Sequence, residues 1–369
     1  MYVSQLSLTS WRNYERAELS LSPGITVFVG RNGQGKTNLV ESIAYLSTLG
    51  SHRTSVPSAL IRAEQPDAII RAKLHSNDRE VLVECQLHRD RPNQAQINRN
   101  PVKPREITKY CHSVVFAPED LGIVRGDPSE RRRFIDSLLV QLQPRFAGVI
   151  ADYERVVKQR NNLLKTARGL AQVSTLDVWN DKLVQLGSEL IRARADVVQQ
   201  LTPYLAAAYR DIVTVDHQPE IRWNLSWSAG VEEPIDDTFR AALAEVYASE
   251  RERGVTLIGP HRDELDCELN GLPVKGYASH GESWSFVLAL KLAAANVLRE
   301  RSLVGDPILI LDDVFAELDT GRRDRLANAI SSYEQVLITA AVEEDIPASL
   351  VANTVQVKAG TIVTGAEGA

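Results

Sequence analysis

The sequence predicts an α/β protein in which one lobe is assembled from both ends of the chain and an all-helical lobe is inserted between them. Near the start, the apolar run ITVFVG leads directly into a glycine-rich loop, and near the end the apolar run PILILDD stops at two aspartates. Such runs are typical of buried parallel strands. Between them, from about residue 119, the hydrophobic spacing becomes helical. A chain of 369 residues is also long for one core, which favours two domains.

The first 110 residues are predicted to be mainly strands. Apolar residues alternate with polar ones at Leu6 and Leu8, at Ala17, Leu19 and Leu21, and at Val81, Val83, Cys85 and Leu87. Alternation with a period of two is typical of a strand with one buried face. A helix is expected from Thr37 to about Leu49, directly after the glycine-rich loop.

The middle of the chain has apolar residues at helical spacing. One run contains Leu138, Leu142, Phe146, Ile150, Tyr153, Val157 and Leu164 with a break at Pro144, and a second contains Val178, Leu183, Leu186, Leu190, Ala193, Val197 and Leu201 and ends near Pro203. These runs predict an antiparallel helical pair. The β/α alternation resumes at GVTLIGPHRDEL, so residues 1–118 together with 256–369 are predicted to form the main lobe. Residues 119–255 form the inserted helical lobe, which is too short for a long coiled coil.

The segment GRNGQGKT fits the phosphate-loop pattern G-x-x-x-x-G-K-[ST] and lies between a strand and a helix, as that pattern requires. Its glycines let backbone N–H groups point at a phosphate, Lys36 reaches the terminal phosphates, and the Thr37 hydroxyl can ligate Mg²⁺. A chance match is the alternative, which the flanking strand and helix disfavour. The residues predicted to bind ATP are Gly30, Arg31, Asn32, Gly33, Gln34, Gly35, Lys36, Thr37 and Asn38.

Two aspartates at the end of the second apolar run supply the carboxylates that a Mg²⁺–nucleotide site needs. Asp312 is predicted to hold the metal together with Thr37, either directly or through water. Asp313 points to the other side of the strand end, where it could act as the catalytic base toward an attacking water. A plain turn after the strand is the alternative interpretation. Lys36 and Asp312 are 276 positions apart, which again requires an insertion.

The segment SHGES directly precedes an apolar helix. Ser279, Gly281 and Glu282 are therefore expected at a helix N-terminus, where unpaired N–H groups and the helix dipole attract an anion. The spacing S-x-x-E is equally that of a plain capping box. The residues alone leave both interpretations open.

The net charge of −6 does not by itself indicate a nucleic-acid-binding protein, but the basic residues are clustered. The candidates for DNA contact are Arg89, Lys103 and Arg105 in one cluster and Arg131, Arg132 and Arg133 in SERRRF. A solvated surface or a network of salt bridges is the alternative. The sequence shows no apolar run that could cross a bilayer, no export signal and only scattered cysteines. These features predict a cytoplasmic protein without a membrane partner.

The order of phosphate loop, S-x-G-E helix and LDDVFAELD resembles that of the ABC-type ATPases of the SMC-like class. That resemblance implies an ABC-type (SMC-like) P-loop ATPase lobe with an inserted all-helical second lobe. It also implies that Ser279, Gly281 and Glu282 close over the nucleotide of a second subunit, and that Asp319 lies in a D-loop near the dimer seam. LTSWRNY, VVFAPEDLGIVRGDPSERRRFID and GPHRDEL narrow the resemblance to the RecF family of bacterial DNA recombination, repair and replication ATPases.

Resemblance to the RecF family implies a weak, DNA-stimulated ATPase that uses ATP and Mg²⁺ and forms an ATP-dependent homodimer. It implies binding to single-strand/duplex junctions and gapped DNA, a RecR partner, a role in loading RecA, and a link to replication and the SOS response. Three positions depart from the usual pattern: Glu282 replaces a glutamine, Thr339 stands where transporter ATPases have a switch histidine, and Asp313 replaces a glutamate. The shorter Asp313 predicts slow hydrolysis. A transporter ATPase, a long-armed chromosome tether and a DNA clamp with a decayed ATPase are the alternatives.

Overall fold

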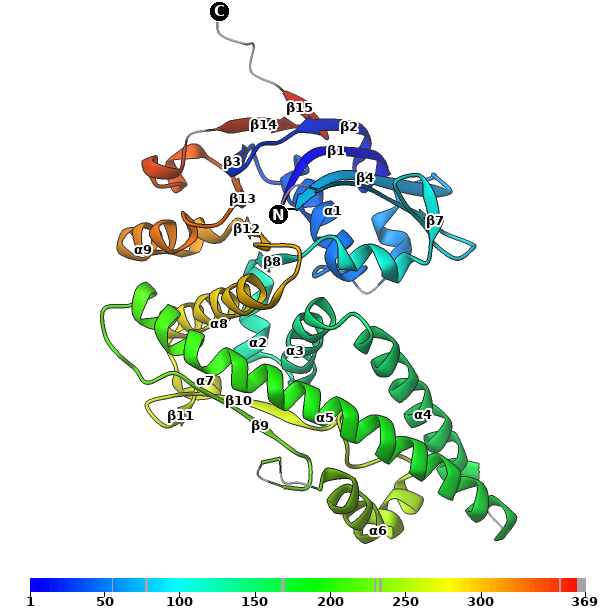
Figure 1. Cartoon of the computed structure of the whole chain (residues 1–369). Coiled ribbons are helices and arrows are strands. Elements are labelled where there is room, and N and C mark those ends of the chain that lie inside the picture. Colours follow the sequence, from blue (N-terminus) through cyan, green and yellow to red (C-terminus); the bar gives the residue numbers. More distant parts are fainter. Residues whose placement is uncertain are drawn as a thin grey trace, which may run out of the picture. The chain divides into compact units, whose positions relative to one another are not determined.

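The computed structural model in Figure 1 describes residues 1–54, 56–76, 79–166, 170–228, 230–231, 234–351 and 353–363, without the side chains of 170–175. The chain divides into two compact units. Unit 1 contains Met1–Leu121, Tyr204–Asp216 and Trp284–Ala369, and unit 2 contains Gly122–Pro203 and His217–Ser283. Unit 2 reaches further toward the C-terminus than the predicted inserted lobe, because strands after residue 263 pair within it.

The first sheet of unit 1 is formed mainly by parallel strands in the order β15-β14-β3-β13-β12-β8. Its members are β3 (Gly24–Val29), β8 (Ser113–Phe116), β12 (Ile308–Asp312), β13 (Gln335–Ala340), β14 (Thr354–Lys358) and β15 (Thr361–Val363), of which only β15 runs antiparallel to its neighbour. Every residue of β12 and β13 is buried, as expected for strands covered on both faces. The predicted strands ITVFVG and PILILDD are confirmed. Because β3 and β12 are parallel to β13 between them, their carboxyl ends meet at one edge of the sheet.

The second sheet of unit 1 is antiparallel and has the order β2-β1-β4-β5-β6-β7. Its members are β1 (Tyr2–Trp11), β2 (Tyr14–Ser20), β4 (Asp67–Ser76), β5 (Arg79–His88), β6 (Gln94–Ile97) and β7 (Asn100–Val102). Burial alternates along β4 and over the predicted stretches of β1, β2 and β5, so one face of this sheet packs on the core and the predicted alternating strands are confirmed.

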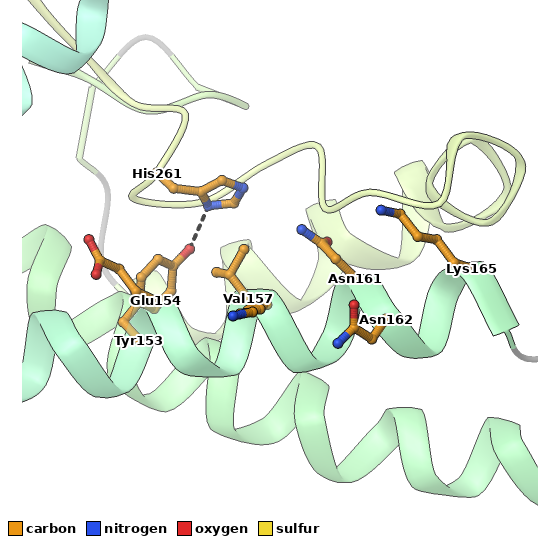
Figure 2. A pocket seen from close by; sticks show the side chains of 8 residues that line it. Tyr153, Glu154, Val157, Asn161, Asn162, Lys165 and His261 are labelled. Carbon is orange, nitrogen blue, oxygen red and sulfur yellow. Dashed lines mark hydrogen bonds between the residues drawn. The ribbon is translucent and has the colours of Figure 1, made fainter. Parts of the chain in front are cut away.

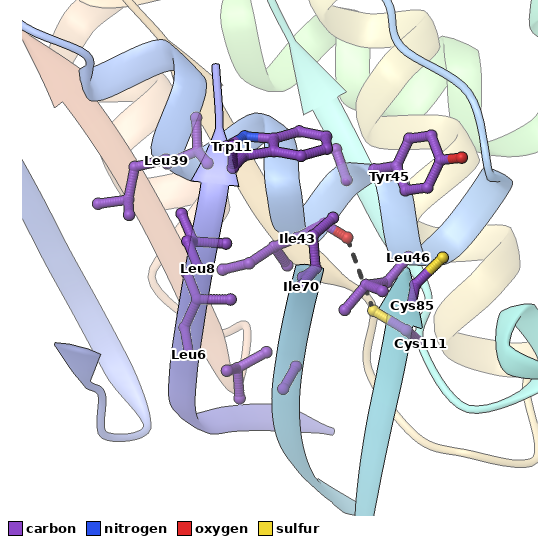
Figure 3. Packing of buried hydrophobic residues seen from close by; sticks show 14 of the residues in the cluster. Leu6, Leu8, Trp11, Leu39, Ile43, Tyr45, Leu46, Ile70, Cys85 and Cys111 are labelled. Carbon is purple, nitrogen blue, oxygen red and sulfur yellow. Dashed lines mark hydrogen bonds between the residues drawn. The ribbon is translucent and has the colours of Figure 1, made fainter. Parts of the chain in front are cut away.

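One hydrophobic core joins both sheets of unit 1 to helix α1 (Lys36–Thr48). Figure 3 shows Leu6 and Leu8 of β1 facing Leu39 and Ile43 of α1. Each fully buried leucine or isoleucine contributes about 1.5–3 kcal/mol to the free energy of unfolding, so the helix that carries the phosphate loop is firmly anchored. Burial also raises the pKa of the Cys111 thiol to about 12, which makes it an inert core residue.

Two further helices flank strand β12 in the sequence, and the first of them begins in unit 2. Helix α9 (Thr320–Ile330) begins at Asp319, whose carboxylate caps it by accepting a hydrogen bond from the Arg322 N–H. Helix α8 (His280–Arg301) has a long apolar stretch, and Phe286 and Leu290 are fully buried. The short 3-10 helices of the chain are η1 (Pro57–Leu60), η2 (Pro104–Lys109), η3 (Pro118–Asp120), η4 (Val314–Glu317), η5 (Glu343–Asp345) and η6 (Ala348–Leu350).

Unit 2 is mainly helical. Its helices are α2 (Leu121–Arg125), α3 (Pro128–Leu142), α4 (Phe146–Thr166), α5 (Leu170–Ile212), α6 (Ile235–Arg253) and the short α7 (Val274–Tyr277), of which α2 begins and α5 ends in unit 1. The first predicted helical run is split between α3 and α4 at Pro144, as expected. The predicted end near Pro203 is wrong, because α5 continues through it to Ile212. Leu205, Tyr209 and Ile212 are fully buried, and their burial outweighs the roughly 3 kcal/mol that an internal proline costs.

Unit 2 also contains a three-stranded antiparallel sheet that the sequence analysis did not predict. Its order is β11-β10-β9, with β9 (Glu220–Asn224), β10 (Glu264–Leu269) and β11 (Leu272–Pro273). The inserted lobe is therefore not made of helices alone. The strands EIRWN and ELDCEL are short and rich in charged residues. Their few apolar residues therefore do not distinguish them from a solvated loop in the sequence.

Candidate nucleotide-binding site

The phosphate loop lies between β3 and α1, and its backbone admits only glycine at two positions. A Cβ atom on Gly30 would lie 2.3 Å from the Val357 carbonyl oxygen. Gly35 has φ +112°, and a Cβ atom there would lie 2.6 Å from the Asn13 amide nitrogen. Gly35 is also the N-cap of α1 and makes no side-chain cap, so the first N–H groups of α1 have no intrahelical or side-chain cap partner. This loop therefore fits an anion such as a phosphate group.

The loop is supported from behind by the segment LTSWRNY, whose role the sequence analysis did not identify. The Trp11 indole N–H donates to the Asn38 carbonyl oxygen at 2.7 Å, and the Tyr14 hydroxyl donates to the Gly35 carbonyl oxygen at 3.0 Å. The Asn13 amide donates to the Gln34 carbonyl oxygen at 3.2 Å. These contacts hold the loop by its carbonyl groups and use none of its N–H groups, of which those of Gly30 and Gln34 donate to the carbonyl oxygens of Ala340 and Arg31.

The residues predicted to bind ATP differ in their exposure to solvent and in their hydrogen-bond partners. Arg31 and Asn32 are exposed, whereas Lys36 is buried and its ammonium group donates to the Gly30 carbonyl oxygen at 2.7 Å. The Asn38 side chain is bonded to Asn13 at 2.7 Å and to Arg53 at 2.8 Å, so its amide belongs to the supporting network.

The parallel strands bring three predicted polar groups together at the edge of the sheet. The Asp312 carboxylate accepts hydrogen bonds on one oxygen, Oδ1, from the Thr37 hydroxyl at 2.8 Å and the Thr339 hydroxyl at 2.6 Å. Burial raises the pKa of Asp312, and the two hydroxyl donors oppose that rise. A hydroxyl that donates its hydrogen keeps its lone pairs, so Thr37 can still ligate a cation. Carboxylate and hydroxyl oxygens are the donors that Mg²⁺ prefers, so these residues fit the predicted metal.

Asp313 follows the strand in a left-handed conformation with φ 53°. Its backbone N–H donates to the Thr339 hydroxyl oxygen at 3.0 Å. Within the described part of the chain, its carboxylate makes no hydrogen bond and no ion pair. Asp313 is half-buried, and its unengaged carboxylate is available to a water molecule.

The segment SHGES, which contains Ser279, Gly281 and Glu282, forms a complete capping box in unit 2. The Glu282 carboxylate accepts from the Ser279 N–H at 2.8 Å, and the Ser279 hydroxyl accepts from the Glu282 N–H at 3.3 Å. Ser279 is exposed and Gly281 is half-buried. The helix is therefore capped as the S-x-x-E spacing predicts. The serine remains at the surface, where another molecule can contact it. Asp319 of the predicted D-loop is 59% exposed and caps α9.

The three arginines of SERRRF are engaged within unit 2. Arg131 is only 7% exposed and forms a bidentate pair with Glu264, at 2.6 and 3.0 Å. Arg132 donates to the Asp263 carbonyl oxygen at 2.8 Å, and Arg133 pairs at the surface with Glu130. The prediction that Arg131 contacts DNA disagrees with its burial, because its guanidinium group is bound to a carboxylate on β10.

The other predicted basic cluster lies in unit 1. Arg89 donates to the carbonyl oxygens of Gln65 and Arg62, at 2.7 and 3.0 Å, and so ties two loops together. Lys103 is exposed, and Arg105 is 61% exposed and 3.7 Å from Glu106. Lys103 and Arg105 therefore remain accessible to an anionic partner.

Unit 2 has a pocket of about 310 Å³ along α4, lined mainly by residues with polar groups and shown in Figure 2. At one end the Tyr153 hydroxyl and the His261 Nδ1 atom are 2.9 Å apart, and His261 Nε2 lies 3.2 Å from the Thr256 carbonyl oxygen. A carbonyl oxygen can only accept, so Nε2 carries the proton and Nδ1 accepts from the tyrosine. Burial lowers the pKa of His261 to about 4, which keeps the ring neutral. The motif GPHRDEL is thus explained as part of the internal bonding of unit 2.

No helix among the described segments is both long enough and apolar enough to span a lipid bilayer.

The chain is similar to known proteins over nearly its whole length. A family model described as the RecF/RecN/SMC N-terminal domain matches residues 2–362. The DNA replication and repair protein RecF of Leifsonia xyli subsp. xyli is 56% identical over 98% of this chain and 99% of its own length. RecF of Streptomyces avermitilis is 48% identical over 98% of this chain and 99% of its own.

Solved structures show the same fold. A structure of the recombination mediator protein RecF-ATP in the RecFOR pathway superposes with a TM-score of 0.88 at 25% identity, covering 99% of this chain and 98% of that chain. An Smc head domain from Pyrococcus furiosus superposes with a TM-score of 0.55 at 15% identity over 98% of this chain and 95% of that chain. The predicted α/β fold of the ABC-type, SMC-like class is confirmed.

Proposed function

We propose a function for this chain on the premise that it belongs to the RecF family of DNA replication and repair proteins. It is an ATP-dependent DNA-binding protein of recombinational repair, and its ATPase resides in unit 1. One observation supports this most directly. A phosphate loop with two positions that admit only glycine lies at the same sheet edge as Thr37 and Asp312. ATP and Mg²⁺ are its ligands.

The residues of unit 1 have distinct roles in this proposal. The loop from Gly30 to Asn38 binds the phosphates through its backbone N–H groups, and Lys36 neutralises their charge. Thr37 ligates the metal, and Asp312 holds it through water, because its Oδ1 atom already accepts from two hydroxyl groups. When bound, Mg²⁺ would neutralise charge on the terminal phosphates. Asp313 orients the attacking water and accepts its proton, and its short side chain makes hydrolysis slow.

Two copies of the chain form the active assembly in this proposal. The exposed Ser279, with Gly281 and Glu282, closes over the nucleotide held by the other copy, and Asp319 lies near the seam. The capping box supports this role, because it fixes the serine hydroxyl at a helix end where the dipole favours an anion. The ATP-bound dimer binds gapped DNA at single-strand/duplex junctions, acts with RecR to promote RecA loading, and resets by slow, DNA-stimulated hydrolysis.

The test separates capping from anion binding at Ser279. Aspartate and asparagine both cap helices as well as serine does, but only aspartate brings a negative charge. We expect Ser279→Asn to dimerise with ATP, as measured by sedimentation, and Ser279→Asp to bind ATP as a monomer without dimerising. Lys36→Met should lose both ATP binding and dimerisation. Equal dimerisation of the two Ser279 variants would remove the role in trans, and ATP-driven dimerisation of Lys36→Met would remove the nucleotide site.

A further inference from the structure

One arginine of unit 2 is fastened to the segment SHGES that carries Ser279. The Arg125 Nε–H donates to the Ser283 hydroxyl oxygen at 3.1 Å, and the Arg125 Nη2 atom lies 3.5 Å from the Ala278 carbonyl oxygen. The Ser283 hydroxyl in turn donates to the Ser279 carbonyl oxygen at 2.8 Å. These contacts, all within unit 2, hold the Arg125 guanidinium group beside Ser279.

The Arg125 guanidinium group keeps free donors and an uncompensated charge. A guanidinium group has five N–H donors, and the two contacts use no more than two of them. Arg125 is exposed, and it forms no ion pair with any residue that the structure describes, including Asp127 two positions later. Arg131 differs, because its guanidinium group is held bidentately by Glu264. Arg125 can therefore still bind an anion.

Lys275 places a second positive charge near the same segment. Its ammonium group donates to the carbonyl oxygen of Gly126, the residue after Arg125, at 2.9 Å. Lys275 is exposed and pairs with no carboxylate among the described residues. The Glu282 carboxylate accepts from the Ser279 N–H and completes the helix cap. The surface around Ser279 thus carries two accessible cations, and it suits a ligand with several negatively charged oxygens, such as a triphosphate.

We infer that Arg125 contacts the γ-phosphate of the ATP that the other copy of the chain holds. The inference rests on the proposed function, because it needs the assembly in which Ser279 closes over that nucleotide. A guanidinium group can bind two phosphate oxygens at once through parallel N–H···O bonds. ADP has no γ-phosphate to offer to this contact. Arg125 therefore helps to make the assembly depend on ATP.

The test places two substitutions in different copies or in the same copy of a mixed dimer. Lys36→Met prevents one copy from holding ATP, so each mixed dimer contains one nucleotide. In the first arrangement Lys36→Met and Arg125→Gln are in different chains, and the nucleotide faces an intact Arg125. In the second arrangement both changes are in one chain that is mixed with wild type, and the nucleotide faces the glutamine.

Energy transfer between fluorophores attached to the two kinds of chain reports only the mixed dimers. With a non-hydrolysable ATP analogue and Mg²⁺, we expect the first arrangement to dimerise at least about tenfold more tightly than the second, because only the first has the contact between Arg125 and the nucleotide. A contact within one copy predicts the reverse order. Equal affinities or the reverse order overturn the inference.

A further variant separates a charge contact from mere support of the segment SHGES. Arg125→Gln keeps an N–H donor for Ser283 but loses the charge, whereas Arg125→Lys keeps the charge. In the second arrangement lysine should recover part of the affinity that glutamine loses, and equal dimerisation of the two variants overturns the inference. Both variants should bind the ATP analogue as monomers with wild-type affinity, because their own phosphate loops are unaltered.

Arg253→Gln is the matched control for the loss of an exposed positive charge. Arg253 ends α6 in unit 2, is exposed and has no ion-pair partner in the described part of the chain. In place of Arg125→Gln it should leave both arrangements equally tight, and a loss as large as that of Arg125→Gln contradicts the inference. Failure of wild-type copies to dimerise with the ATP analogue would overturn the proposed function instead.

Discussion

The shared carboxylate oxygen of Asp312 makes Thr339→Val an informative substitution. Valine has nearly the shape of threonine, so the change removes a hydroxyl without opening a cavity. Two groups lose their partner: Asp312 loses a donor at 2.6 Å, and the Asp313 N–H loses its acceptor at 3.0 Å. A hydrogen bond to a charged group contributes about 1.5–3 kcal/mol, and an unpaired buried N–H costs about 1–3 kcal/mol. We therefore expect the free energy of unfolding of unit 1 to fall by about 3–5 kcal/mol.

The same substitution acts on the metal. Without the Thr339 donor the pKa of Asp312 rises further, because a hydrogen bond that opposes the effect of burial is lost. Partners that orient a metal ligand typically account for 10–100-fold in metal affinity. We expect Thr339→Val to need at least tenfold more Mg²⁺ for half-maximal ATP binding, and urea denaturation to show the stability loss. Thr339→Ser keeps the hydroxyl and is the control. Indistinguishable Mg²⁺ titrations of the two variants would refute the reasoning.

Two other predictions concern turnover and DNA. Asp313→Asn should retain ATP-dependent dimerisation, hydrolyse ATP at least about 100-fold more slowly and stay longer on gapped DNA; unchanged hydrolysis would exclude Asp313 as the base. For the wild-type chain, log affinity for gapped DNA should fall linearly with log salt, and Lys103→Glu with Arg105→Glu should reduce that slope by about 2, one for each lost phosphate contact. Arg16→Glu, at an exposed arginine paired with Glu18, is the surface control. Equal slopes in all variants would dismiss the unit 1 cluster as a DNA contact.

Features of the fold that depend on neighbouring residues in the chain were predictable from the sequence. The runs around β3, β12 and β13 are apolar for their whole length, and such runs leave little alternative to buried strands. The continuation of α5 through Pro203 was not predictable from local rules. Its cause is the burial of residues two to nine positions later, and that burial depends on elements far away in the chain.

The same distinction applies to the site. The glycine-rich loop was recognisable because its residues are contiguous and fit one local pattern, in which Gly33 and Gly35 adopt positive φ angles. Arg12 and Glu41 carry no such local signal. Their roles come from a tertiary contact between the turn after β1 and helix α1, and a single arginine or glutamate in the sequence has many possible partners.

Charge clustering in the sequence was the least reliable guide, for a physical reason. The segment SERRRF predicts a positively charged surface patch. The Arg131 guanidinium group, however, is paired with the carboxylate of Glu264, 133 positions later in the chain. Arg194 is paired in the same way with Asp136, at 2.8 Å on both carboxylate oxygens. A paired and buried arginine cannot displace counterions from DNA, because its charge is already neutralised. A DNA-binding surface is therefore better sought among exposed cations that pair with no carboxylate. Counting only described residues as partners, Lys103 meets that criterion in unit 1, and Lys158 and Lys165 meet it along the pocket of unit 2.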